Sequence, residues 1–241
     1  MGCGSLKEYI EKQLNKKVDF VILTHGHLDH CGGINEFIDL PIYMNSLDID
    51  LGNESNKVEN RFNSLQKHGV TIEEIQPNID FSITKELKDG DEFDLGEITL
   101  KAIHTPGHTK GMTMILIKEE RTILFGDGCG VGVLLYFPFS SSVEEYKETL
   151  INLKKHENQY DKIIRNHGTC ESNKDLLDNV IECCELILKG KDDKGEVYKK
   201  TPSNTGLTNI YYAKAVDRDT GNRIDGKFGN IIYSEDKIYK K

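Results

Sequence analysis

The sequence predicts an α/β fold, because short apolar runs alternate with longer amphipathic segments. Residues 18–24 (VDFVILT) are rich in β-branched side chains and are typical of a buried strand. Residues 140–156 open with serines and place acidic residues in the first turn and basic residues in the last, which predicts a helix. Residues 172–190 predict a second helix that ends at Gly190. The 241 residues suffice for one sizeable core, so we expect a single domain over 1–241.

The remaining elements follow from apolar periodicity and turn residues. Helices are expected over residues 5–14, with Ser5 as the cap, over 33–40 and over parts of 48–68. Strands are expected at 41–45, in a strand–turn–strand unit over 88–105, in a hairpin over 112–127 that turns at 118–121, and at 161–168. Residues 191–241 are rich in lysine, aspartate and glycine and form an atypical tail with β-like pieces at 208–216 and 229–234.

Composition and charge narrow the class of protein. Hydrophobic residues make up 37% and charged residues 29% of the chain, which is typical of a globular protein. No apolar run reaches the roughly 20 residues that span a membrane, and no signal peptide is visible, so we expect a cytoplasmic protein without a membrane partner. The net charge of −9 and the scattered basic residues argue against a nucleic-acid partner.

Metal-capable side chains crowd the segment LTHGHLDHCGG, residues 23–33. His25, His27, Asp29 and His30 fall within six positions, directly after a predicted buried strand and before a glycine pair. A histidine pair two residues apart on a tight turn can aim both imidazoles at one point, while the aspartate and third histidine can serve a second ion. This spacing predicts a metal centre rather than a solvated polar loop.

More histidines and aspartates follow other predicted strands. His104 and His108 lie in HTPGHTKG, Asp127 lies in FGDG, and His167 lies in NHGT. Side chains placed where several strands meet their loops can gather at one edge of a sheet framework. We therefore expect them to share the site of the first cluster.

The motifs THGHLDH, HTPGHTKG, FGD and NHG together resemble those of the metallo-β-lactamase-fold hydrolase superfamily, in order and in spacing, over roughly residues 3–170. The HTPGHT segment and the KDGDEFDLG stretch before it are similar to the glyoxalase II-like and lactonase branches. The resemblance implies an αββα sandwich. It also implies two divalent metal ions, of which zinc is expected and iron or manganese are alternatives. The ligands that it implies are His25, His27 and His108 for one ion, Asp29, His30 and His167 for the other, and Asp127 as the bridge.

In such a family the two ions hold a bridging hydroxide that attacks a carbonyl carbon. The resemblance thus implies a hydrolase of a small ester, thioester or lactone, with Asp29 also orienting the hydroxide or moving its proton. A mononuclear iron persulfide dioxygenase is an alternative, and so is a non-catalytic metal-binding or interaction protein. An RNA-processing nuclease of the same fold is disfavoured by the net charge.

The sequence also predicts roles, less specifically, for one tyrosine, three further histidines and four cysteines. Tyr136 follows the Asp127 loop, where some lactonase relatives place a tyrosine that assists the substrate, although a packing role is the commoner one. His104 is expected to pack or to support the ligands, and His68 and His156 are expected at the surface. Four cysteines are expected to be small buried side chains, with an oxidation-sensitive pocket or an adventitious soft-metal site as the alternatives: Cys3, Cys31, Cys129 and Cys170.

The sequence also departs from the family pattern at both ends. It begins at MGCGSLKEYI, which resembles the loop that follows the family's usual N-terminal strands, so we expect those strands to be absent. An exposed sheet edge would favour a homo-oligomer. The tail lacks the helical segment with basic residues that glyoxalase II carries, which disfavours that enzyme itself.

Overall fold

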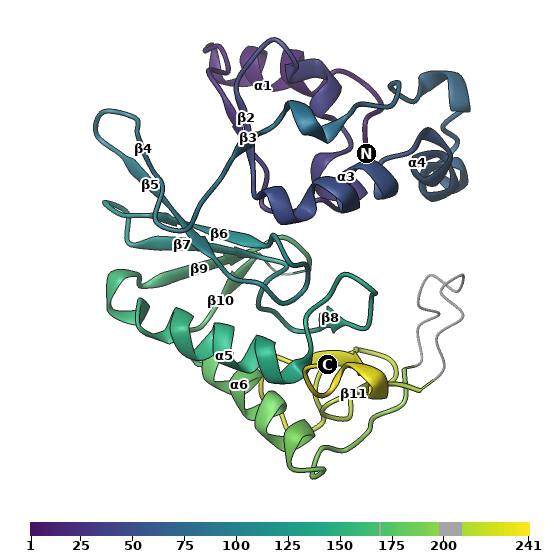
Figure 1. Cartoon of the computed structure of the whole chain (residues 1–241), viewed down its shortest axis with the longest axis vertical. Coiled ribbons are helices and arrows are strands. Elements are labelled where there is room, and N and C mark those ends of the chain that lie inside the picture. Colours follow the sequence, from purple (N-terminus) through teal and green to yellow (C-terminus); the bar gives the residue numbers. More distant parts are fainter. Residues whose placement is uncertain (169, 198–208) are drawn as a thin grey trace. The chain divides into compact units, whose positions relative to one another are not determined.

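The computed structural model describes residues 1–168, 170–197 and 209–241 and contains both helices and sheets, which confirms the α/β class (Figure 1). The chain divides into two compact units, Met1–Asp89 and Gly90–Lys241. The single domain over 1–241 stays a prediction. Within the described ranges, no helix is both long and apolar enough to cross a membrane.

The first unit is built on a three-stranded parallel sheet in the order β1-β2-β3. Its strands are β1 (Val21–Ile22), β2 (Ile42–Met44) and β3 (Lys85–Glu86). The buried side chains of Leu23, Met44 and Phe81 form the centre of its core. The helices of the unit are α1 (Leu6–Leu14), α2 (Leu28–Cys31), α3 (Ile49–Ser55) and α4 (Val58–Leu65), with short 3₁₀ turns η1 (Ile34–Phe37), η2 (Ser46–Asp48), η3 (Gln66–His68), η4 (Ile72–Glu74) and η5 (Phe81–Ile83).

Three predictions for this unit need correction. The strand predicted over 18–24 is regular only at β1, because this short sheet pairs just two of its residues with β2. The helix predicted over 33–40 is the 3₁₀ turn η1. The Ser5 side chain does not cap α1. The Glu36 carboxylate accepts hydrogen bonds from Leu6 N at 3.0 Å and Lys7 N at 2.8 Å instead, so the cap comes from 30 residues away.

The second unit is built on a six-stranded mixed sheet in the order β10-β9-β7-β6-β5-β4. Neighbouring strands are antiparallel except β7 and β9, which are parallel. The hairpin predicted over 112–127 is confirmed, with its turn closed by a hydrogen bond from Arg121 N to Lys118 O. The strands are β4 (Glu92–Asp94), β5 (Thr99–His104), β6 (Thr113–Ile117), β7 (Thr122–Gly126), β9 (Lys162–Arg165) and β10 (Glu171–Ser172).

Two helices, α5 (Val143–Lys154) and α6 (Asp175–Leu188), lie side by side against this sheet (Figure 1). They share one apolar core with the sheet, which includes Leu116, Phe125, Tyr146 and Val180. The predicted start of the first helix is confirmed, because Ser142 and Glu145 form a reciprocal capping box. Both helices therefore bury their apolar faces against the sheet.

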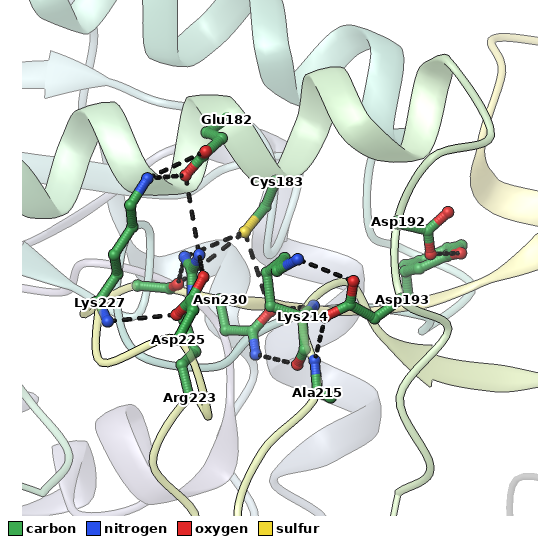
Figure 2. A network of polar contacts seen from close by, with 12 residues as sticks. Glu182, Cys183, Asp192, Asp193, Lys214, Ala215, Arg223, Asp225, Lys227 and Asn230 are labelled. Carbon is green, nitrogen blue, oxygen red and sulfur yellow. Dashed lines mark hydrogen bonds and ion pairs between the residues drawn. The ribbon is translucent and has the colours of Figure 1, made fainter.

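The C-terminal segment adds a second small sheet to this unit, in the order β11-β12-β8. Its strands are β8 (Val133–Leu135), β11 (Ile210–Tyr212) and β12 (Ile231–Ser234), and 3₁₀ turns lie at η6 (Glu157–Gln159) and η7 (Glu235–Lys237). The β-like pieces of the tail are thus confirmed, apart from residue 208, which lies outside the described residues. A polar network around the buried Arg223 ties the segment to α6: its guanidinium donates to Asp225 and to Gly229 O, and Lys227 pairs with Glu182 (Figure 2).

Candidate metal centre

The histidine-rich segment of the first unit forms a tight turn that leads into α2. The ring centroids of His25 and His27 lie 4.9 Å apart, and those of His25 and His30 lie 4.2 Å apart. The Asp29 carboxylate lies beside this group, with Oδ2 3.4 Å from His30 Nε2. Three imidazoles and one carboxylate of the predicted set therefore meet within six residues of chain.

In the second unit, Asp127 and His167 follow the parallel neighbours β7 and β9. Parallel strands deliver their carboxyl ends to the same edge of a sheet, and Gly126 is the register partner of Arg165. Between Leu124 and Gly126 the register shifts, so β7 carries an extra residue there. Such a bulge re-aims the side chains that follow it. Gly126 has a φ of +53°, and an added Cβ would lie 3.0 Å from the Met112 side chain, so this turn favours glycine.

The Asp127 carboxylate lies between two predicted ligands. Its Oδ2 is 3.2 Å from His167 Nε2 and 3.8 Å from His108 Nε2. The resemblance assigns these two histidines to different ions and the aspartate to both. Asp127 therefore lies between the two histidines of its unit, and its bridging role stays a prediction.

His108 is held by β8 and by the segment that follows it. Its Nδ1 donates to the Leu134 carbonyl oxygen at 3.1 Å, while the Ser140 hydroxyl donates to the main-chain carbonyl of His108 at 2.8 Å. A neutral imidazole whose Nδ1 carries the proton presents its lone pair at Nε2, the atom that faces Asp127. The Leu134 carbonyl thus selects the tautomer that a metal ligand needs.

The donor set of each unit fits a divalent ion chemically. Imidazole nitrogens with carboxylate oxygens suit zinc, iron and manganese. The first unit gathers His25, His27, Asp29 and His30, and the second gathers His108, Asp127 and His167. Four of the seven predicted ligands therefore lie in the first unit and three in the second.

The other predicted residues have clear positions. His104 Nε2 donates to the Lys110 carbonyl oxygen at 2.8 Å and so braces the loop that carries His108, in line with a supporting role.

Tyr136 is only 2% exposed, and its ring centroid lies 4.4 Å from that of Phe137. Burial raises the pKa of Tyr136 to about 12. Its substrate-binding role stays a prediction. His68 is exposed as expected, whereas His156 is half-buried, because it follows α5 into the turn η6.

The four cysteines of the motifs fall into two classes. Cys31 and Cys129 are buried, and burial raises the pKa of each thiol to about 12. Cys3 and Cys170 are exposed, so the expectation of buried side chains is wrong for these two. A raised pKa keeps a thiol protonated and unreactive.

Comparison with known proteins identifies the family. The model of the metallo-beta-lactamase superfamily matches residues 2–158. This chain is a member of that superfamily. The metallo-beta-lactamase IND-7 superposes with a TM-score of 0.54 at 18% identity, over 75% of this chain and 74% of that one. The metallo-beta-lactamase from Pontibacter korlensis superposes with a TM-score of 0.54 at 14% identity, over 75% of each chain. These superpositions confirm the αββα fold class of the superfamily.

Curated relatives of this superfamily member include enzymes by name. A hydroxyacylglutathione hydrolase of Brucella anthropi is 33% identical over 133 residues, which is 50% of this chain and 40% of that protein. A beta-lactamase-like protein 2 homolog of Caenorhabditis elegans is 27% identical over 209 residues, which is 83% of this chain and 59% of that protein. The chain spans about half the length of the curated relatives that it matches.

Several supporting residues escaped the sequence analysis. Leu134 acts through its main-chain oxygen, which no side-chain pattern can indicate. Arg165, at the end of β9, and Asp48, in the turn η2, are charged side chains that are nevertheless buried, and no sequence pattern distinguishes them from exposed charges. Buried charges of this kind are rare unless they are paired, so their partners become visible only in the structure.

Proposed function

We propose that this superfamily member is a metal-dependent hydrolase of a small ester, thioester or lactone. The proposed ligands of its two divalent ions, with zinc as the expected metal, are His25, His27, Asp29, His30, His108, Asp127 and His167. The observation that carries the proposal is the place of the Asp127 carboxylate, within 3.8 Å of both His108 and His167. When bound, such a pair of ions lowers the pKa of water toward about 7 and polarises a substrate carbonyl.

In the proposed hydrolysis, individual residues of the chain have different roles. Asp127 supplies negative charge between the two histidines of its unit, and the Leu134 carbonyl holds His108 in the tautomer that ligates. Asp29 is exposed and lies beside His30, so its carboxylate can take up and release a proton. The substrate is a small molecule in this proposal. The name of the Brucella anthropi relative favours a thioester among the three classes.

The test is the metal content of the full chain purified without added metal, with Asp127→Ala as the diagnostic variant. About two zinc ions per chain, lost in that variant, would support the proposal and lead to a screen of esters, thioesters and lactones. Asp217→Asn changes an exposed acid of the same unit and should leave the metal content unchanged. One iron per chain would favour the persulfide dioxygenase instead, and no metal after reconstitution would favour a non-catalytic protein.

A further inference from the structure

We propose that Asp48 is a positioning residue, which fixes the turn that carries His25 and His27. This inference rests on the proposed function, because it concerns the ligand pair of that metal site. Asp48 ends the turn η2 and is 1% exposed, and it lies 21 residues beyond the second of the two histidines. It contributes no atom to the predicted ligand set.

The contacts that carry the inference are made to Gly26, the residue between the two histidines. The Asp48 carboxylate accepts a hydrogen bond from Gly26 N, with Oδ2 at 3.0 Å. On the other side, the carbonyl oxygen of Gly26 accepts from the Ser55 hydroxyl at 2.6 Å and from the Asn56 side-chain amide at 3.3 Å. Both polar groups of this glycine are therefore held by side chains of the segment 48–56.

These two anchors act on both imidazoles. The N–H of Gly26 belongs to the peptide that joins it to His25, and its carbonyl belongs to the peptide that joins it to His27. Fixing both peptide planes leaves little freedom at the backbone dihedrals on either side, because the peptide bond itself is planar. The Cα–Cβ directions of the two histidines are fixed with them. A ligand pair held in this way binds an ion without the loss of conformational entropy that ordering a mobile turn would require.

The packing of the turn leaves no room for a side chain at Gly26. A Cβ added at Gly26 would lie 2.8 Å from the main-chain oxygen of Asp48 and 2.9 Å from Gly52 N. The turn thus lies directly on the chain that supplies its hydrogen bonds. Asn45 in turn caps η2, since its Oδ1 accepts from Leu47 N at 3.1 Å while its amide donates to Leu87 O at 3.1 Å. Asp48 therefore sits on a rigid support.

A buried carboxylate is a costly choice for a purely structural hydrogen bond. Moving a charge out of water is expensive, and a neutral acceptor would serve the Gly26 N–H at lower cost. A hydrogen bond to a charged acceptor is about twice as strong as one between neutral groups. The extra strength is useful where the geometry of a ligand pair, rather than stability alone, is at stake.

The experiment compares the full chain with Asp48→Ala and Asp48→Asn, using zinc alone as the probe. Zinc affinity is measured by competition with a chromophoric chelator. Loss of a residue that orients metal ligands typically costs about 10–100-fold in affinity, which is the expected result for Asp48→Ala. Asp48→Asn keeps an oxygen that can accept from Gly26 N but lacks the charge, so it should recover only part of the loss. Equal losses in both variants would overturn the proposal.

A matched control and a metal-free measurement separate this inference from the proposed function. Asp80→Ala also removes a carboxylate that accepts from a main-chain N–H of this unit, Ser82 N at 2.9 Å, and should leave zinc affinity unchanged. NMR of the metal-free chain follows hydrogen exchange at Gly26 N–H and the ring signals of His25 and His27. If the wild type bound no zinc, the proposed function would fail. Unchanged Gly26 exchange and ring signals in Asp48→Ala would overturn the positioning role in either case.

Discussion

The buried guanidinium of Arg165 donates from Nη1 to the main-chain carbonyl oxygen of His167 at 3.1 Å. Its Nε donates to Ser172 Oγ at 2.6 Å, and its main-chain N–H donates to Cys170 O at 2.7 Å. The side chain of His167 is itself 63% exposed. One buried arginine at the end of β9 therefore holds a loop whose histidine receives little packing of its own.

Arg165→Gln should weaken the metal site that uses His167. The variant loses the planar fork that reaches two partners at once, so the loop no longer has a fixed position. We expect about 10–100-fold weaker binding of one of the two proposed ions, measured as zinc per chain during titration. Arg223→Gln is the matched control, because it removes another buried guanidinium of the same unit from a network that involves no predicted ligand (Figure 2). Equal metal loss in both variants would contradict the prediction.

Gly26→Ala should destabilise the protein, because its Cβ would meet main-chain atoms that cannot rotate away. Overpacking of this kind costs about 1–3 kcal/mol, or more where backbone must move. The free energy of unfolding from urea titration measures the effect. Gly33→Ala is the comparison, since its Cβ would have no neighbour closer than 3.8 Å and its φ is −98°. A loss as large at Gly33 would show that the clash at Gly26 is not the cause.

Thiol reactivity should divide the cysteines by burial. Iodoacetamide should modify Cys3 and Cys170 in the folded chain and spare the four buried thiols, Cys31, Cys129, Cys183 and Cys184. Burial raises the pKa of each buried thiol, so the thiolate that reacts is scarce near neutral pH. Peptide mass spectrometry at short reaction times reads out each site. Rapid labelling of Cys31 or Cys129 would revive the hypothesis of an oxidation-sensitive pocket.

Stability should fall in alkaline solution through Cys183. Burial raises the pKa of this thiol from 9.0 to about 11 in the folded protein. The unfolded chain then loses the proton first, so the stabilising effect is complete below about pH 9 and is lost as the pH rises toward about 11. The loss is at most about 3 kcal/mol, at about 1.4 kcal/mol per pH unit. Cys183→Ser keeps the shape without this titration, and its free energy of unfolding should decline less between pH 8 and 10. Parallel curves would contradict the assignment.

Local patterns in the sequence predicted much of the fold. Three predicted features depend on interactions within a few residues, which spacing reveals. They are the start of α5 after a serine, the hairpin that turns between residues 118 and 121, and the end of α6 before Gly190. The short length of β1 and the cap of α1 by Glu36 were not predicted, because they depend on partners distant in the sequence. Periodicity carries no information about such pairings.

By itself, the sequence determined the donor chemistry of the candidate site: histidine and aspartate at the ends of predicted strands, in a chain whose residues 2–158 match the superfamily model. Only the tertiary structure decided how those donors are held. The register of β7 with β9 sets Asp127 beside His167, the Leu134 carbonyl selects the tautomer of His108, and Asp48 fixes the turn at Gly26. The physical reason is that ligand type is a property of single residues, whereas orientation arises from hydrogen bonds between residues far apart along the chain.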